Sequence, residues 1–539
     1  MKRMKISMSS SPVKDADVGQ LKPTASTIQR VVAVIDIGAT AMRMAVAEIH
    51  AGAKVRMLDQ LVQPVQLGKE AFETRRLSRK STERVVSVLA QYQRVLREYG
   101  IEGTSDIRVV GTSAVREASN RLAFADRVYT ATGLHVEPID EAEVNRITYM
   151  GITPQLLANA ELSNGKAMVL EVGGGSTEVL IVRSGNVLAS NSFRLGSLRM
   201  LQAIDLARAG ADRRRALLEN HINRTLNQLN EFVRGDSQLN LVAVGGDIRL
   251  ATRLIVDDWQ PGELAVMPTK SLTELTDTVL KMGDDEIVKR FDASFIEAET
   301  LGPALLAYAM LAKQFRLEHV YVSDTNLREG LLKDIAVGGS WTAEFRNQIV
   351  RSALSLGRRF HFDEMHARSV AELARKLFDQ LRSEHLLDNR HEVILHVAAL
   401  LHEIGMQINV RSHHKHSLYI IKYSELFGLS RSELLQVGLI ARYYRRAPPQ
   451  PSHTDYMSLD RETRVIVNKL ASILRLATAL DDTRTSRIRE IECQTDGKRL
   501  MIHVPGVRDV SLEQIAMKQQ AGLFRDVFGL SVVLRAGET

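Results

Sequence analysis

Short aliphatic runs alternate with amphipathic segments over residues 30 to about 150, and the alternation returns between about 159 and 340. The runs predicted to be buried strands are 31–35, 43–49, 107–110, 168–172, 179–182, 241–244 and 319–322. Apolar residues at a helical period predict helices at 82–99 and 213–232. The repetition indicates two α/β lobes with a cleft between them.

After about residue 345 the pattern changes to long amphipathic helices, expected at 345–382, 392–404 and in later stretches up to 480. The last 40 residues return to a strand, helix, strand order, at 500–504, 512–528 and 530–534. The first residues are polar, Ser/Lys-rich and typical of a disordered tail. The expected parts are a tail, lobe I, lobe II, a helical domain and a small α/β domain, at 1–29, 30–158, 159–342, 343–490 and 491–539.

A glycine-rich turn between two predicted strands is the most informative motif of the chain. A strand ends after Glu171, three glycines follow, and Glu178 stands where the next strand begins. Because glycine has no Cβ, the backbone N–H groups of this turn can close on an anion. The phosphate-binding candidates are Gly173, Gly174, Gly175 and Ser176.

An earlier turn repeats this arrangement. Asp36 ends a strand, and Gly38 and Thr40 precede the next one. Paired hairpins of this kind hold phosphates from both sides of a cleft in actin-like ATPases and sugar kinases. A further turn at residues 111–113 opens a helix that contains Arg116, and the N-terminus of a helix is a natural anion site.

The composition narrows the possible partners only mildly. There are 71 basic and 64 acidic residues, and the net charge of +7 favours anionic ligands. No basic stripe interleaved with aromatic residues indicates binding to a nucleic acid duplex. The single cysteine, Cys493, excludes an internal disulfide framework and fits the cytoplasm. No stretch reaches the roughly 18 apolar residues that a membrane span needs, so we expect no membrane partner.

These motifs together resemble the exopolyphosphatase/guanosine pentaphosphate phosphohydrolase (Ppx/GppA) family over essentially residues 30 to 536. The matching segments are 36–38, 112–120, 173–178, 195–199, 327–330 and 401–405. The resemblance implies an α/β fold: a two-lobe actin-like core, followed by an all-α His-Asp-like domain and a small α/β domain. It also implies a homodimer, Mg²⁺, and hydrolysis of terminal phosphoanhydrides of inorganic polyphosphate or guanosine pentaphosphate.

The resemblance and the motifs assign roles to the candidate residues. Glu178 is expected to orient or activate the attacking water. Asp36 and Glu171 are expected to hold Mg²⁺, directly or through waters, because hard oxygen ligands suit that ion. Arg116 and the N–H groups of the glycine turn are expected to bind phosphate oxygens.

Three departures from the family pattern affect these roles. Ala39, Thr40 and Ala41 follow Gly38 where the family has more side-chain donors, and Glu171 replaces an aspartate. Val144 stands at the position of the family's catalytic glutamate, directly after Glu143. Neighbouring residues on a helix point about 100° apart, so Glu143 could replace that glutamate only after a local shift.

Three hypotheses stay open at this point. The first, which we favour for the class of reaction, is an active hydrolase with a relocated base, Glu143 or Glu141. The second is a catalytically weak protein that binds or senses polyphosphate or a guanosine nucleotide. The third is a kinase-like ATPase.

The predicted helical domain contains a His402-Glu403 dipeptide, with His366 upstream. The order resembles metal-dependent phosphohydrolases that use a His-Asp dipeptide. Since Glu403 replaces the aspartate and Thr478 stands where a second aspartate is expected, we expect no functional metal there. Three further histidines are expected in a solvated loop or an anion groove, at positions 413, 414 and 416.

Overall fold

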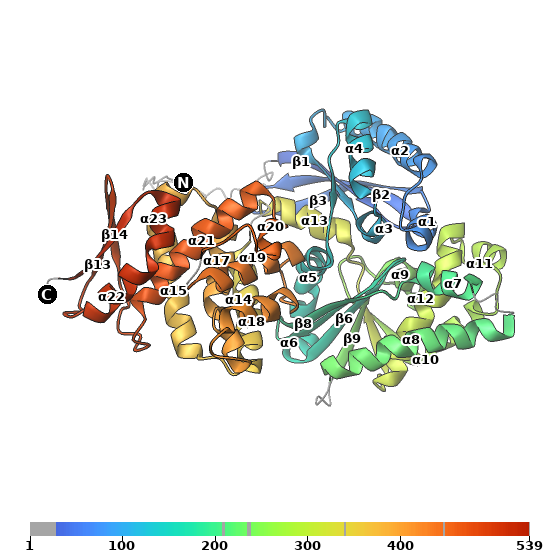
Figure 1. Ribbon diagram of the computed structural model, residues 1–539. Coiled ribbons are helices and arrows are strands. Elements are labelled where there is room, and N and C mark those ends of the chain that lie inside the picture. Colours follow the sequence, from blue (N-terminus) through green and yellow to red (C-terminus); the bar gives the residue numbers. More distant parts are fainter. Residues whose placement is uncertain (1–27, 207–210, 234–238, 339–340, 446–447, 538–539) are drawn as a thin grey trace, which may run out of the picture.

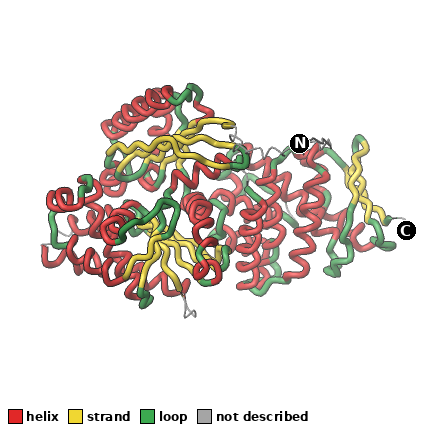
Figure 2. The backbone as a smooth tube through the Cα atoms, turned by 180° about the vertical axis from the view of Figure 1, so that it is seen from behind, coloured by secondary structure: helices red, strands yellow, loops and turns green. Residues whose placement is uncertain are grey.

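This computed structural model describes residues 28–206, 211–233, 239–338, 341–445 and 448–537 of the protein. Two α/β lobes lie one above the other at one end of the molecule (Figure 1). A block of helices follows, and a small sheet lies at the opposite end, which Figure 2 shows from behind. Of the tail expected at 1–29, residues 1–27 lie outside the described part, and Ile28 already belongs to the first strand.

Lobe I is built on a five-stranded sheet of order β3-β2-β1-β4-β5. Strands β1 to β3 form an antiparallel meander, while β4 and β5 run parallel to β1. The strands are β1 (Ile28–Ile37), β2 (Ala41–His50), β3 (Lys54–Pro64), β4 (Ile107–Gly111) and β5 (Val136–Pro138). The helices are α1 (Leu67–Thr74), α2 (Arg79–Glu98), α3 (Ser113–Glu117) and α4 (Arg121–Thr132). Helices cover both faces of β1, which explains its continuous aliphatic run.

Lobe II repeats this topology with one added strand, in the order β10-β11-β9-β6-β7-β8. The repeat that the sequence predicted is therefore present, and the mixed α/β class is confirmed. The strands are β6 (Lys166–Val172), β7 (Thr177–Arg183), β8 (Asn186–Phe193), β9 (Leu239–Val244), β10 (Ala265–Pro268) and β11 (His319–Val322). The helices are α6 (Ala160–Asn164), α7 (Ser197–Leu206), α8 (Ala211–Val233), α9 (Gly246–Ile255), α10 (Thr269–Val279), α11 (Asp284–Phe291) and α12 (Phe295–Gln314).

Helix α12 is long and apolar enough to cross a membrane by length and composition alone, which the sequence analysis did not expect. However, 72% of its most apolar window is buried inside the structure, where it packs in the core of lobe II. Burial of this kind is typical of a core helix.

Two helices connect the lobes. Helix α5 (Glu141–Ala158) runs from lobe I to lobe II, and α13 (Leu327–Ala336) returns to lobe I after the last strand of lobe II. On α13, Leu331 and Leu332 are fully buried in one cluster with Val32 and Val34 of β1. Lobe I is therefore not limited to residues before the predicted boundary at 158, because α13, which follows lobe II in the sequence, completes the core of lobe I.

The helical region differs from the sequence prediction at several points. The helix predicted at 345–382 is divided at residues 360–363, where the carboxylate of Asp363 accepts a hydrogen bond from the backbone N–H of His366 and caps a new helix. The solvated loop predicted for the later histidines is wrong, because they lie in a helix and His413 is fully buried. The helices are α14 (Ala343–Arg359), α15 (Glu364–Gln380), α16 (Arg382–His385), α17 (Asn389–Leu401), α18 (His413–Lys422), α19 (Arg431–Tyr443), α20 (Thr454–Met457) and α21 (Arg461–Leu480).

The C-terminal sheet has the order β12-β13-β14, with β12 antiparallel and β14 parallel to β13. The sequence analysis missed β12, whose residues are mostly polar and exposed. The helix predicted at 512–528 is two helices, because the chain turns at Ala521. The elements are β12 (Glu492–Asp496), β13 (Arg499–Val504), β14 (Ser531–Ala536), α22 (Ser511–Gln520) and α23 (Gly522–Phe528).

Candidate active site

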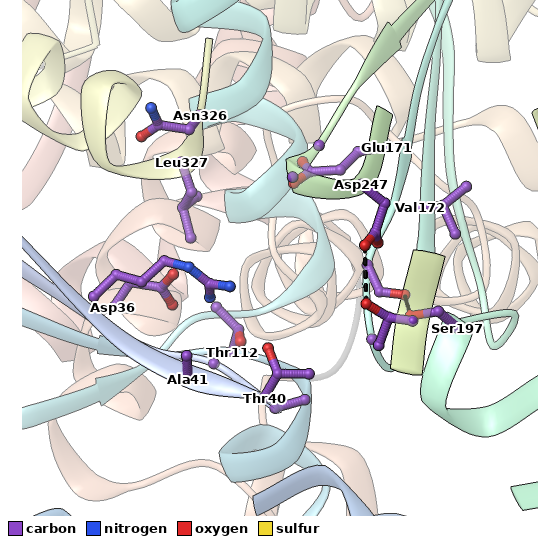
Figure 3. A pocket seen from close by; sticks show the side chains of 18 of the residues that line it. Asp36, Thr40, Ala41, Thr112, Glu171, Val172, Ser197, Asp247, Asn326 and Leu327 are labelled. Carbon is purple, nitrogen blue, oxygen red and sulfur yellow. Dashed lines mark hydrogen bonds between the residues drawn. The ribbon is translucent and has the colours of Figure 1, made fainter. Parts of the chain in front are cut away.

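A cleft of about 580 Å³ lies between the two lobes, at the ends of β1 and β6. Figure 3 shows Asp36 and Thr112 of lobe I across this pocket from Glu171 and Asp247 of lobe II. The structure brings almost all of the predicted site residues together here: Asp36, Gly38, Thr40, Arg116, Glu171, Gly173, Gly174, Gly175, Ser176 and Glu178.

The two hairpin turns have the same backbone geometry. In the first, the N–H of Gly38 donates to the carbonyl of Ala41 at 3.1 Å, and in the second the N–H of Gly173 donates to the carbonyl of Ser176 at 2.9 Å. Within the described chain, the N–H groups of Gly174, Gly175 and Ser176 have no hydrogen-bond acceptor. Three such groups in a row at a cleft wall can bind phosphate oxygens.

The packing of the two lobes also favours glycine at position 175. A Cβ at this position would lie 2.4 Å from Cζ of Phe72 and 2.5 Å from Oγ of Ser113, both in lobe I. Any other residue would therefore require the side chains of Phe72 and Ser113 to move. The glycine lets the second hairpin close against lobe I at the base of the cleft.

Glu178 has the most unusual environment of the cleft carboxylates. Its Oε1 accepts hydrogen bonds from the hydroxyls of Ser176 (2.8 Å) and Ser192 (2.9 Å), whereas the buried Oε2 has no partner among the described residues. Burial raises the pKa of Glu178 to about 7, although the Ser176 hydroxyl and the charge of Arg116 oppose the increase. A carboxyl with a pKa near the working pH is suited to accepting and releasing a proton.

The cleft is also lined by the carboxylates of Asp36, Glu171, Asp247 and Glu297. Burial raises the pKa values of Asp36 and Glu171, and it raises the pKa of Asp247 to about 6. Asp247, which the sequence analysis did not select, accepts a hydrogen bond from the hydroxyl of Thr300 at 2.9 Å (dashed line in Figure 3). The end of β6 is fixed by the fully buried Tyr308, whose hydroxyl accepts from the N–H of Val172 and donates to the carbonyl of Val244.

The predicted ligands suit a hydrated Mg²⁺. The buried Oδ1 of Asp36 has no hydrogen-bond partner among the described residues, and both ligand side chains offer hard oxygens. In the described chain these carboxylates do not form a closed cluster of three ligand atoms within 4.8 Å. Mg²⁺ usually binds one or two carboxylates and keeps waters or phosphate oxygens as its other ligands, so this open arrangement fits.

Arginines that the sequence analysis missed supply positive charge to the cleft. Arg43, Arg249 and Arg328 line it together with the predicted Arg116. Arg328 lies 3.6 Å from Asp36, and Arg249 donates to the carbonyl of Thr325. Arg328 belongs to a segment that matched the family, and Arg43 is the residue paired with Asp36 across the hairpin, but neither position indicates its orientation without the fold.

The proposed substitute base Glu143 lies outside this cleft. Its carboxylate accepts hydrogen bonds from the guanidinium of Arg146 at 2.7 and 2.8 Å and from Arg108 at 3.4 Å. The local shift that a catalytic Glu143 requires does not occur, so the geometry gives this assignment no support. Val144 lines the cleft instead, as its alignment with the family's catalytic glutamate predicted. The carboxylate of Glu141, the alternative base, lies 3.8 Å from the guanidinium of Arg116.

Comparisons with known proteins identify the family to which the chain belongs. The model of the Ppx/GppA phosphatase family matches residues 45–337, and the model of domain III of these phosphatases matches residues 350–519. The chain therefore belongs to the Ppx/GppA phosphatase family.

Two relatives are both named guanosine-5'-triphosphate,3'-diphosphate pyrophosphatase. The protein of Aliivibrio fischeri is 24% identical over 460 residues, which cover 83% of this chain and 87% of the relative. The protein of Vibrio campbellii is 24% identical over 500 residues, covering 88% and 91%. The crystal structure of an exopolyphosphatase from Cytophaga hutchinsonii covers 57% of this chain and 98% of its own, with 20% identity and a TM-score of 0.50, and shows a shared fold.

Proposed function

We propose that the protein is a phosphohydrolase that removes terminal phosphate from inorganic polyphosphate, from guanosine pentaphosphate, or from both. The observation that carries the proposal is Glu178, a buried carboxyl with a pKa of about 7 beside the second phosphate-binding hairpin. The names of the relatives support the same substrates.

In the proposed reaction a water oxygen bonds to the terminal phosphorus while the bridging P–O bond breaks, and Glu178 takes the proton of the water. The N–H groups of the second hairpin and Arg116 hold the phosphate oxygens, because most of the catalysis of phosphoryl transfer comes from positioning and charge. Asp36 and Glu171 would hold Mg²⁺, which supplies neutralising charge when bound. The family resemblance also leads us to propose a homodimer in the cytoplasm.

A weak binder or sensor is the second candidate, and Val144 is the observation that favours it. This apolar side chain lines the cleft at the position of the family's catalytic glutamate. Loss of a general base typically lowers a rate by 10² to 10⁴. If Glu178 does not replace that base, the cleft binds its anion and turns it over slowly.

The test is a phosphate-release assay with the purified chain, Mg²⁺, and polyphosphate, guanosine pentaphosphate or ATP as separate substrates. We expect release from at least one of the first two and less from ATP. Binding without release, measured by calorimetry under the same conditions, would favour the sensor. Preferential hydrolysis of ATP would favour the kinase-like ATPase.

A further inference from the structure

A second cluster of functional groups lies in the helical region, away from the cleft. His366 stands in the first turn of α15, while His402 and Glu403 directly follow α17. One ligand atom from each of the three lies within 4.8 Å of the other two, and in the described chain no other group of three such side chains does so.

Both imidazoles are oriented by groups that can only accept hydrogen bonds. Nδ1 of His366 donates to the carboxylate of Asp481 at 2.9 Å, and Nδ1 of His402 donates to the carbonyl of Ala399 at 2.7 Å. A ring that donates from Nδ1 in this way presents its Nε2 as the atom that can bind an ion. A carboxylate or carbonyl behind the ring is the usual support of a histidine that binds a metal.

Neither Nε2 atom accepts a hydrogen bond from another of the described residues. Nε2 of His402 is buried without a hydrogen-bond partner among the described residues. Nε2 of His366 lies 4.0 Å from Oε2 of Glu403, which is too long for a hydrogen bond. Two bonds of about 2.0 to 2.2 Å to one ion can span that distance.

Arg484 already neutralises part of this cluster. Its Nη2 donates to both carboxylate oxygens of Glu403, at 2.6 and 2.7 Å. Arg484 also lies 3.7 Å from Asp363, and its ion pair with Glu403 leaves the buried Nε2 of His402 without a partner among the described residues. The side chain of Arg484 is 41% exposed, so it can move aside and give an ion access from solvent.

We propose that His366, His402 and Glu403 bind one divalent first-row transition metal, in competition with Arg484. Two imidazoles and one carboxylate suit Zn²⁺ and its neighbours and leave coordination positions for water or an anion. The sequence predicted no functional metal here, because Glu403 and Thr478 stand where aspartates are expected. That prediction did not take into account Asp481, which orients the ring of His366. The proposal is independent of the function proposed for the cleft.

The full chain, stripped with a chelator and dialysed against Zn²⁺, should retain about one ion per chain by elemental analysis. His402→Ala and His366→Ala should lose that ion, while the control His391→Ala, in the same region, should keep it. Arg484→Ala should bind Zn²⁺ at least about tenfold more tightly, because a competing cation is removed.

A second test, by absorption spectroscopy, uses the native chain and so does not depend on whether the variants fold. Co²⁺ added to the stripped native chain should give visible absorption bands typical of nitrogen and oxygen coordination, and Zn²⁺ should displace it. The proposal is wrong if neither the native chain nor Arg484→Ala retains Zn²⁺ or shows Co²⁺ bands, or if folded His402→Ala retains the ion.

Discussion

The two hairpins that line the cleft share a backbone and differ in charge. In lobe I the register of β1 and β2 pairs Asp36 with Arg43, whereas in lobe II the same register of β6 and β7 pairs Glu171 with Glu178. The first hairpin thus pairs a carboxylate with a guanidinium group, whereas the second pairs two carboxylates. The two lobes therefore share a hairpin backbone, but the charged side chains at the paired positions differ.

The difference assigns the lobes separate tasks in the proposed reaction. Lobe I contributes Arg43 near Asp36, so its hairpin is suited to charge neutralisation. Lobe II places Glu178 between the hydroxyls of Ser176 and Ser192, so its hairpin is suited to proton transfer.

The largest effect is expected from Glu178→Gln, which removes the proposed base. Phosphate release should fall by about 10² to 10⁴. The matched control Glu143→Gln should leave kcat within about twofold, because Glu143 contacts Arg146 outside the cleft, although the variant should be less stable. In the native chain the rate should rise with pH through about 7, as Glu178 loses its proton.

The opposite result, loss of activity in Glu143→Gln with no effect of Glu178→Gln, would restore the first hypothesis from the sequence. Chemical unfolding of both variants would separate a catalytic effect from loss of folded protein.

The stability of the native chain should also depend on Glu178. Its pKa is raised from 4.5 to about 7, so between these pH values the folded state binds more protons than the unfolded state. The free energy of unfolding should therefore decrease as pH rises through this range, by up to about 3 kcal/mol from this group. Glu178→Gln should lack this decrease in urea unfolding at pH 5 and pH 8. Equal pH dependence in both chains would contradict the assigned environment.

Val144→Glu adds a carboxylate on α5 at a position that lines the cleft. We expect at least about a tenfold gain in phosphate release, because a base within reach of the attacking water can contribute 10² or more. Val144→Gln, of similar size and without charge, is the control. A gain in both variants would mean that polarity, not a base, is responsible.

The smallest effect concerns binding alone. Polyphosphate with Mg²⁺ should raise the melting temperature by a few degrees, since a ligand of the folded state adds RT ln(1 + [L]/Kd). Arg116→Ala should reduce that shift, while Arg121→Ala, on the neighbouring helix α4, should not. An unchanged shift in Arg116→Ala would exclude this arginine from the phosphate contacts.

The strands and turns of the site could be predicted because they depend on local sequence. Aliphatic runs, glycines and flanking acids stand next to each other at residues 31–40 and 168–178, and the structure has both hairpins there. The third strand of each meander was missed. Strand β3 alternates with polar residues such as Gln60, and β8 contains Asn191 and Ser192, so neither has an aliphatic run.

The directions of side chains on long elements could not be predicted in the same way. On α5, Glu143 and Val144 are neighbours, yet only Val144 lines the cleft, because Arg146 and Arg108 hold the glutamate on the other side. Arg108 belongs to β4, far from α5 in the sequence. Contacts of this kind depend on how distant segments pack.

The return of α13 to lobe I has a consequence for synthesis on the ribosome. One face of the first sheet needs Leu331 and Leu332, which are made long after Val32 and Val34. About 300 residues separate the two pairs, so at about 5 to 20 residues per second this apolar face stays uncovered for roughly 15 to 60 s. The nascent chain therefore exposes a patch that chaperones can bind until all of lobe II has been translated.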